Sequence, residues 1–237
     1  MRELYYEDIS KERPLCLKKV IKRGKEIFRW FARPAHCVEF QTRLAQYFNL
    51  TETPRAPSEA VRITILRRDE DRHFDESGTY DYLKKILDPQ LATVQLVTFD
   101  RVRSGPKLQP PTHAEQLRIL RETDVLIAAH GAGLSSVAML RPGRSVVIEL
   151  FPNNFRYPMY EELSLSCGIR YISIESPIVW PKHCCKGRTT ADMEAIRVPS
   201  DVQGVGGARS CKKCDIFVER QTWVAVITSA VGTVLGL

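Results

Sequence analysis

The sequence lacks the features that mark several specialised classes of protein. Its apolar, uncharged C-terminal stretch, residues 223–237, is shorter than the roughly 20 residues that a membrane-spanning helix needs. The opening residues 1–8 contain no apolar segment of the kind found in signal peptides. No internal repeat is present. These absences leave an ordinary folded domain, and the hydrophobic content of 43% is enough for a buried core.

Cysteine is too scarce for a disulfide scaffold, but seven cysteines allow two or three bridges in a secretory protein. Cys211-x-x-Cys214 together with His183-Cys184-Cys185 forms a weak zinc pattern, and we expect disulfides rather than zinc in a lumenal protein. No metal site is therefore predicted. Asn49 begins the sequon Asn49-Leu50-Thr51, which predicts a glycosylation site if the chain enters a secretory lumen.

The formal net charge of +7 favours acidic partners, such as a nucleoside diphosphate, nucleic acid or an anionic membrane. Ordinary solubility explains it equally well, because the basic residues are spread along the chain. Nucleic acid is the weakest of these partners, because the sequence offers neither aromatic platforms nor a recognition helix. The apolar segment 223–237 fits a buried strand or helix, a marginal membrane tail or a misread gene end.

An alternation of strands and helices begins after a polar, proline-bearing linker at 51–58. A helix at about 35–48 precedes it, and 177–220 shows no clear periodicity. Five apolar β-branched runs predict the strands, at 61–66, 92–99, 124–129, 145–151 and 169–174, and helices are predicted at 80–87, 112–122 and 157–167 and after the turn at 131–133. This order predicts a doubly wound parallel α/β domain at 59–176, between residues 1–58 and an irregular extension at 177–237.

The loop after the central strand, His130-Gly131-Ala132-Gly133, is the best candidate for binding a ligand. Ligands of open parallel sheets bind beyond the carboxyl ends of the strands. Glycines let the backbone approach a phosphate, and a following helix offers free N–H groups and the positive end of its dipole. His130 adds a donor for a phosphate or sugar oxygen. A Gly-x-Gly turn is also a common structural connection, so this signal is weak alone.

Charged residues follow other strands at the same predicted edge. Arg67, Arg68 and Arg72 come after the first strand, and a guanidinium suits a diphosphate because it binds two oxygens at once and stays charged. Glu149 lies near the end of the fourth strand, where a carboxylate would accept from ribose hydroxyls or form an ion pair with one of these arginines. We therefore predict a donor site made of Arg67, Arg68, Arg72, His130, Gly131, Ala132, Gly133 and Glu149.

An ordered set of motifs resembles glycosyltransferase family 61. The set comprises Glu115-Gln116-Leu117, the stretch from Thr123 to Leu134, Leu140-Arg141-Pro142-Gly143, Val147-Ile148-Glu149-Leu150 and, upstream, Ile63 to Arg68 with Arg72. The likeness covers about residues 60–176 and is nearest to the branch of EGF-domain-specific O-linked N-acetylglucosaminyltransferases and their protein O-mannose relatives. One departure is that Asp75-Glu76 stands where the family usually has asparagine after the arginines.

The resemblance implies the donor-binding, C-terminal half of a two-domain GT-B enzyme with Rossmann-like domains. It implies inverting transfer from a UDP-sugar to a protein or glycan hydroxyl, and the sugar donor in the nearest branch is UDP-GlcNAc. It also implies that the protein resides in the lumen of the endoplasmic reticulum or Golgi and associates with the membrane. No cofactor is implied, the nucleotide sugar being the substrate. Because only about 60 residues precede the first strand, we expect a truncated acceptor domain and poor transfer or none. The sequence does not assign the catalytic base to a residue. The alternatives are a non-catalytic remnant of such an enzyme and a basic nucleotide-binding module.

Overall fold

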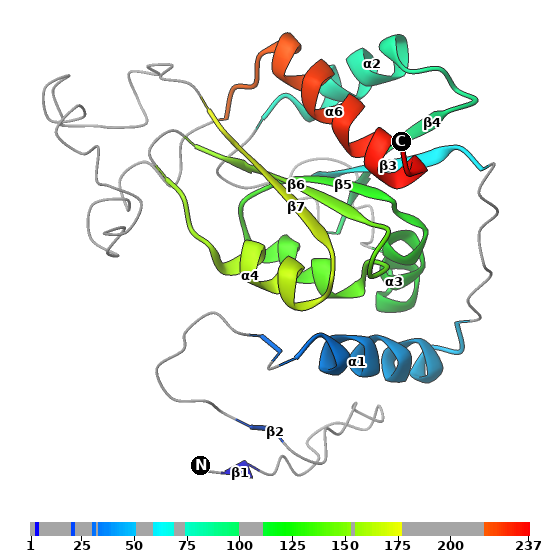
Figure 1. The fold of residues 1–237 in the computed structure, drawn as a ribbon, viewed down its shortest axis with the longest axis vertical. Coiled ribbons are helices and arrows are strands. Elements are labelled where there is room, and N and C mark those ends of the chain that lie inside the picture. The colour runs from blue at the N-terminus through cyan, green and yellow to red at the C-terminus, as the bar shows by residue number, and fades with distance from the viewer. Residues whose placement is uncertain are drawn as a thin grey trace, which may run out of the picture.

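The structure, a computed structural model, describes residues 3–4, 20–21, 30–31, 33–50, 59–68, 74–99, 111–152, 155–176 and 216–237. Among them a five-stranded parallel sheet forms the centre of the molecule (Figure 1). Its strands are β3 (Val61–Arg67), β4 (Ala92–Thr98), β5 (Val125–Ala129), β6 (Val146–Phe151) and β7 (Arg170–Glu175). They lie side by side in the order β4-β3-β5-β6-β7. The predicted parallel α/β sheet is confirmed, and it is Rossmann-like.

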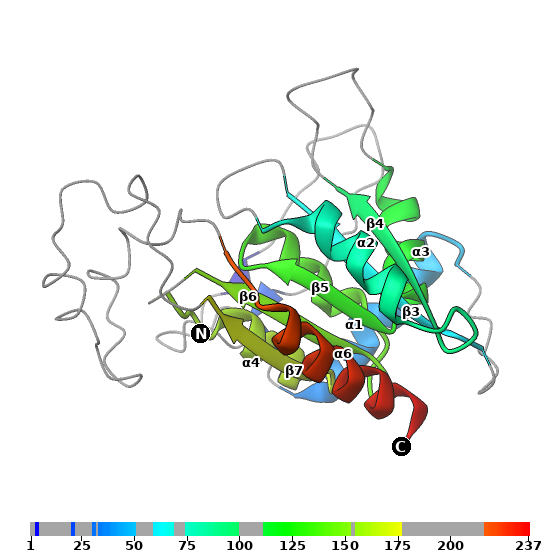
Figure 2. The same cartoon turned by 90° about the horizontal axis from the view of Figure 1, so that it is seen from above.

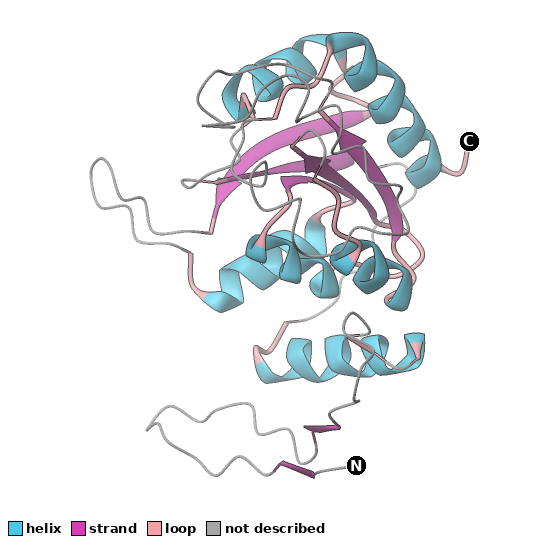
Figure 3. Cartoon of the chain, turned by 90° about the vertical axis from the view of Figure 1, so that its left-hand side faces the viewer, coloured by secondary structure: helices cyan, strands magenta, loops and turns pink. Residues whose placement is uncertain are grey.

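Helices cover both faces of this sheet (Figures 1 and 3). On one face lie α2 (Glu76–Ile86) and α6 (Arg220–Leu235), whose buried side chains share a core with β3, β5 and β6. On the other face lie α3 (His113–Glu122), the 3-10 helix η1 (Ala132–Met139) and α4 (Met159–Ser166). Every residue of β5 and β6 is buried, as expected for central strands covered on both sides.

The helix α1 (Pro34–Tyr47) adds a further layer beneath η1 and α4. A disulfide joins Cys37 of α1 to Cys167, just after α4. The buried Gln41 donates from Nε2 to the main-chain oxygens of Ala138 and Leu140, both at 2.8 Å. These oxygens lie at the end of η1, where helical carbonyls need an outside donor. The sequence predicted a remnant of an N-terminal domain and a linker at 1–58, and these bonds join the α1 part of that range to the α/β unit.

Three elements differ from the sequence prediction. Helix α2 begins at Glu76 rather than Tyr80, because the Asp75 carboxylate accepts from the N–H of Gly78 at 2.8 Å and caps the helix earlier. The helix after the glycine turn is a 3-10 helix. The apolar C-terminal segment is the helix α6, which buries Trp223, Ile227 and Ala230 against the sheet. The predicted linker at 51–58 lies outside the described residues. Two short strands near the start of the chain, β1 (Glu3–Leu4) and β2 (Val20–Ile21), pair antiparallel.

Candidate functional site

A change of direction in the strand order marks one position at the carboxyl edge of the sheet. The chain passes from β3 outward to β4 and then returns to β5 on the other side of β3. The helices that follow β3 and β5 lie on opposite faces of the sheet, and doubly wound folds bind ligands at strand ends in this arrangement. Figure 2, seen from above, shows β3 and β5 as neighbours.

Arg68 and the main chain of the glycine turn meet at this position. Arg68 follows β3, and its Nη1 donates to the main-chain oxygen of His130 at 3.0 Å. A Cβ atom at Gly131 would overlap Arg68 Nη1, so the absence of a side chain is what allows the guanidinium to lie against the turn. Arg68 Nε is buried without a hydrogen-bond partner in the part of the chain that the structure describes. The group therefore retains donor capacity beside the turn.

The structure describes only one of the other two predicted arginines. Arg67, the last residue of β3, is exposed. Arg72 lies outside the described residues. Ala132 and Gly133 form the exposed first turn of η1. The first N–H groups of a helix have no partner within the helix, so the main-chain N–H groups of this turn are suited to binding a ligand at the sheet edge. In the next turn, the buried Ser136 hydroxyl has no hydrogen-bond partner among the described residues.

A buried chain of hydrogen bonds runs inward from the turn across three strands. His130 Nδ1 lies 2.5 Å from Glu149 Oε1, and the Tyr171 hydroxyl donates to Glu149 Oε2 at 2.6 Å. Glu149 is fully buried and His130 is 5% exposed, so solvent does not compete for these bonds. An ionised carboxylate only accepts, which assigns the Nδ1 proton to His130 and leaves Nε2 as the other ring nitrogen.

This network changes the interpretation of Glu149. The sequence offered ribose hydroxyls or an arginine as its partner, whereas the structure gives both carboxylate oxygens to His130 and Tyr171. Sequence reasoning missed Tyr171. Its one signal is a tyrosine on the strand next to Glu149, two residues before Ser173, which pairs with Glu149 in the β6–β7 register. Burial and the neighbouring Glu149 carboxylate raise the pKa of Tyr171 well above its usual 10.0, so the hydroxyl stays a donor.

Aromatic side chains enclose the His130 ring. Phe151 stacks on it with a centroid distance of 5.1 Å, and Phe155 meets it edge-on at 5.1 Å. Tyr157 and Tyr160 complete the enclosure at 6.0 and 5.4 Å. A ring held by packing on its faces and by Glu149 at Nδ1 has little freedom to rotate. The site thus combines a fixed imidazole, a guanidinium and the first turn of a helix.

Two further properties of the described residues concern metal ions and the membrane. They contain no group of three or more His, Cys, Asp or Glu side chains suited to holding a metal ion. None of their helices is long and apolar enough to cross a membrane. The cysteines of the weak zinc pattern, 184, 185, 211 and 214, lie outside the described ranges.

Comparisons with known proteins do not show a family for this chain. No protein-family model matches the chain, and no curated protein matches it. Among solved structures, it is similar to a probable 2-hydroxyacid dehydrogenase from Rhizobium etli, in complex with NADP, HEPES and L(+)-tartaric acid. The TM-score is 0.31 and the identity 14%, and the match covers 65% of this chain. It covers 55% of the dehydrogenase chain, little more than half of its length.

Proposed function

We propose that this chain is the nucleotide-sugar-binding domain of an inverting glycosyltransferase that uses a UDP-sugar. UDP-GlcNAc is the first candidate for this donor. The observation that carries the proposal is the placement of Arg68 against the Gly131 turn, at the sheet edge where the strand order changes direction. The ordered motifs shared with glycosyltransferase family 61 supply the choice of reaction. The two-domain GT-B architecture is part of the same proposal.

The diphosphate of the donor would lie over the glycine turn. Arg68 has a buried Nε without a described partner, and a guanidinium can form two parallel bonds to phosphate oxygens. The first turn of η1, with Ala132 and Gly133 exposed, adds main-chain donors on the other side. Arg67 and Arg72 would add long-range attraction for the anion. These groups fit a diphosphate better than a sugar hydroxyl, because all of them donate.

His130 would take part as an oriented ring rather than as a mobile side chain. Glu149 and Tyr171 fix its Nδ1 side, which leaves Nε2 for a donor oxygen. Glu149 then acts through His130 as a positioning residue, and it does not itself hold ribose.

In the proposed reaction, a base removes the proton of the acceptor hydroxyl, whose oxygen attacks the anomeric carbon from the face opposite the diphosphate. The bond from that carbon to the diphosphate breaks, and UDP leaves with the electron pair. Arg68 and the η1 N–H groups would stabilise the charge that develops on the leaving diphosphate. The acceptor would be a protein serine or threonine or a glycan hydroxyl, and the base is not assigned to a residue.

A secretory lumen is the compartment that fits this proposal. The Cys37–Cys167 disulfide supports it, because disulfides persist in oxidising compartments. Asn49 of the sequon is exposed just after α1, where an oligosaccharide would meet no packing obstacle in the described structure. The endoplasmic reticulum or Golgi, with an association with the membrane, remains the proposed location.

Calorimetry with UDP and with uridine tests the donor site. UDP should bind more tightly, because most of the proposed contacts are to phosphate, and equal affinity would contradict the proposal. A transfer assay with labelled UDP-GlcNAc and an EGF-domain or O-mannosyl peptide then tests the reaction. Specific UDP binding without transfer would support a nucleotide-binding module instead of an active enzyme.

A further inference from the structure

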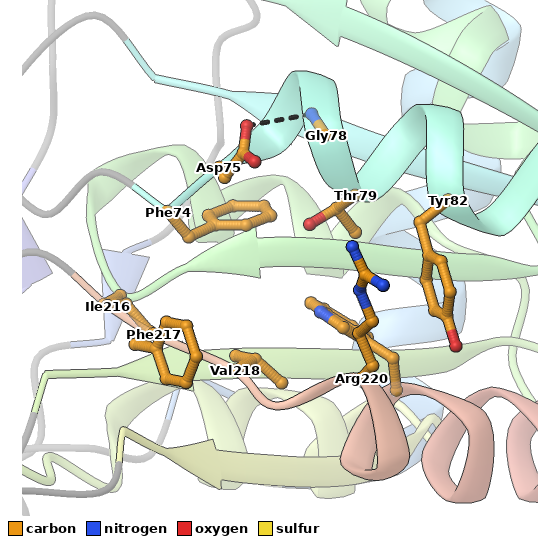
Figure 4. Close-up of a pocket in the computed structure, with 10 residues that line it drawn as sticks. Phe74, Asp75, Gly78, Thr79, Tyr82, Ile216, Phe217, Val218 and Arg220 are labelled. Carbon is orange, nitrogen blue, oxygen red and sulfur yellow. Dashed lines mark hydrogen bonds between the residues drawn. The ribbon is translucent and has the colours of Figure 1, made fainter.

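A pocket of about 320 Å³ lies between α2 and the start of α6, on the face of the sheet opposite α3, η1 and α4 (Figure 4). Its volume is at the lower end of the range for small-molecule sites. The residues that line it are Phe74, Asp75, Gly78, Thr79, Tyr82, Ile216, Phe217, Val218, Arg220 and Trp223. None of them belongs to the candidate donor site, so the pocket's ligand has to be inferred from the pocket's own residues.

The floor of the pocket is apolar and largely aromatic. Phe74, Ile216 and Trp223 are 5%, 4% and 3% exposed, and the rings of Phe74 and Trp223 lie 6.4 Å apart. Phe217, at the rim, is 52% exposed. Aromatic side chains in such an arrangement offer faces and edges to a flat ring. The floor thus favours an aromatic body in the ligand.

A cation stands at the rim of the pocket. Arg220, the first residue of α6, is exposed, and its guanidinium lies over the Tyr82 ring at 5.6 Å from the centroid. Figure 4 shows its side chain extending from α6 towards Thr79 and Tyr82 of α2. No acidic side chain pairs with Arg220 in the described ranges, and Glu219 makes no side-chain cap on the first turn of α6. A carboxylate at this position would meet both the guanidinium and the positive end of the helix dipole.

One polar side chain also lines the pocket between these rings. Thr79 is 7% exposed, and its hydroxyl forms no hydrogen bond to another described residue, although it is not among the fully buried polar atoms that lack a partner. A hydroxyl on an α-helix often bonds to the carbonyl four residues earlier, but here the Asp75 oxygen accepts only from the Thr79 N–H. Figure 4 shows the Thr79 oxygen directed into the pocket. The hydroxyl can therefore donate to a ligand that enters the pocket.

We propose that this pocket binds a small aromatic carboxylate, with one ring or two fused rings. The ring lies on Phe74 and Trp223, one carboxylate oxygen accepts from the Thr79 hydroxyl, and Arg220 donates to the carboxylate from the rim. The binding is reversible and involves no covalent step. The site is separate from the proposed UDP site.

Calorimetry with indole-3-acetate and 4-hydroxybenzoate, each beside its uncharged analogue indole or phenol, tests the proposal on the full chain. At least one carboxylate should bind more tightly than its analogue. Arg220→Gln should weaken carboxylate binding about tenfold, and Thr79→Val, which keeps the shape of the side chain, about fivefold. Arg170→Gln is the matched control, because Arg170 bonds to Thr233 near the opposite end of α6. It should leave binding unchanged.

Three outcomes would overturn the proposal. They are the absence of binding by either carboxylate at millimolar concentration, equal binding of carboxylate and uncharged analogue, and unchanged binding in both pocket variants. Competition with UDP distinguishes this site from the donor site. UDP should not displace the carboxylate, and displacement would mean that the pocket is part of the donor site. A failure to bind UDP would contradict the proposed function and leave this test unaffected.

Discussion

Arg68 is the residue on which the proposed donor site depends most directly. Arg68→Lys keeps the positive charge but removes the planar fork, so UDP binding should weaken by about 1–3 kcal/mol, the scale of a charged hydrogen bond. Calorimetry measures the change. Arg62→Lys is the control, because Arg62 lies at the start of the same strand and pairs with Glu122. Equal UDP affinity in Arg68→Lys and wild type would mean that Arg68 is only a surface charge.

Tyr171 is predicted to stabilise the fold through Glu149. Tyr171→Phe leaves one buried carboxylate oxygen without its donor, which should lower the free energy of unfolding by about 1–3 kcal/mol. Tyr80→Phe is the matched control, because the Tyr80 hydroxyl only accepts a 3.3 Å bond from Lys84 on an exposed surface. Urea unfolding at neutral pH measures both variants, and equal losses would contradict the prediction.

The same tyrosine has a predictable pH dependence. Its folded-state pKa is raised above the usual 10.0, so the unfolded chain releases the proton first. The contribution of Tyr171 to stability is therefore complete below about pH 10 and falls as the pH rises further. The stability difference between wild type and Tyr171→Phe should shrink above that pH. A constant difference up to pH 11 or so would show that the hydroxyl titrates as in the unfolded chain.

At the scale of elements, the glycine turn between β5 and η1 places Arg68. Gly131 has φ 164° and ψ 177°, an extended conformation that valine also adopts, so the backbone itself does not require glycine. The side chain of Gly131→Val would instead displace the Arg68 guanidinium and cover the main chain where phosphate should lie. UDP binding should be lost while the circular dichroism spectrum is retained. Gly232→Val is the control, because a Cβ there meets nothing within 4 Å.

The attachment of α1 is also an element-scale property. Replacing Cys37 and Cys167 together with serine opens a loop with a sequence separation of 130 residues, so stability should fall by about 2–5 kcal/mol. A reductant should lower the stability of the wild type and have a much smaller effect on the double variant. UDP affinity should change little, because the proposed donor groups lie at the sheet edge. No stability difference between the two proteins under oxidising conditions would contradict the prediction.

At the scale of the whole molecule, UDP should stabilise the folded chain, because only the folded sheet edge brings Arg68 and the Gly131 turn together. At a concentration one hundred times its dissociation constant, UDP should add about 2.7 kcal/mol. For a chain of this size the melting temperature should rise by roughly 5–10 °C. Uridine at the same concentration is the control. An equal rise in melting temperature with uridine would show that the nucleoside, and not the phosphates, provides the binding energy.

The net charge of +7 also acts at this scale. It would attract the proposed anionic donor over distances comparable to the Debye length, which is about 8 Å at physiological salt. This attraction is not specific, since it does not depend on where the arginines lie. Position within the fold decides which of them can hold a diphosphate.

Local patterns in the sequence determined the strands of the sheet and the start of α3. The β-branched runs predicted all five strands of the sheet to within about two residues at each end. Thr112 and Glu115 predicted the start of α3, and both reciprocal bonds of the capping box are present. Such signals need only the neighbours along the chain, because strand periodicity and helix capping are properties of a few consecutive residues.

Only the tertiary structure decided which residues of different elements are in contact. Glu149 pairs with His130 and Tyr171 because β5, β6 and β7 are adjacent, a fact that no spacing along the chain encodes. The same holds for the Cys37–Cys167 bridge and for the burial of α6, whose uniform apolar sequence fitted a strand, a core helix or a membrane tail equally. Contacts between residues far apart in sequence depend on the packing of whole layers, which local patterns constrain but do not specify.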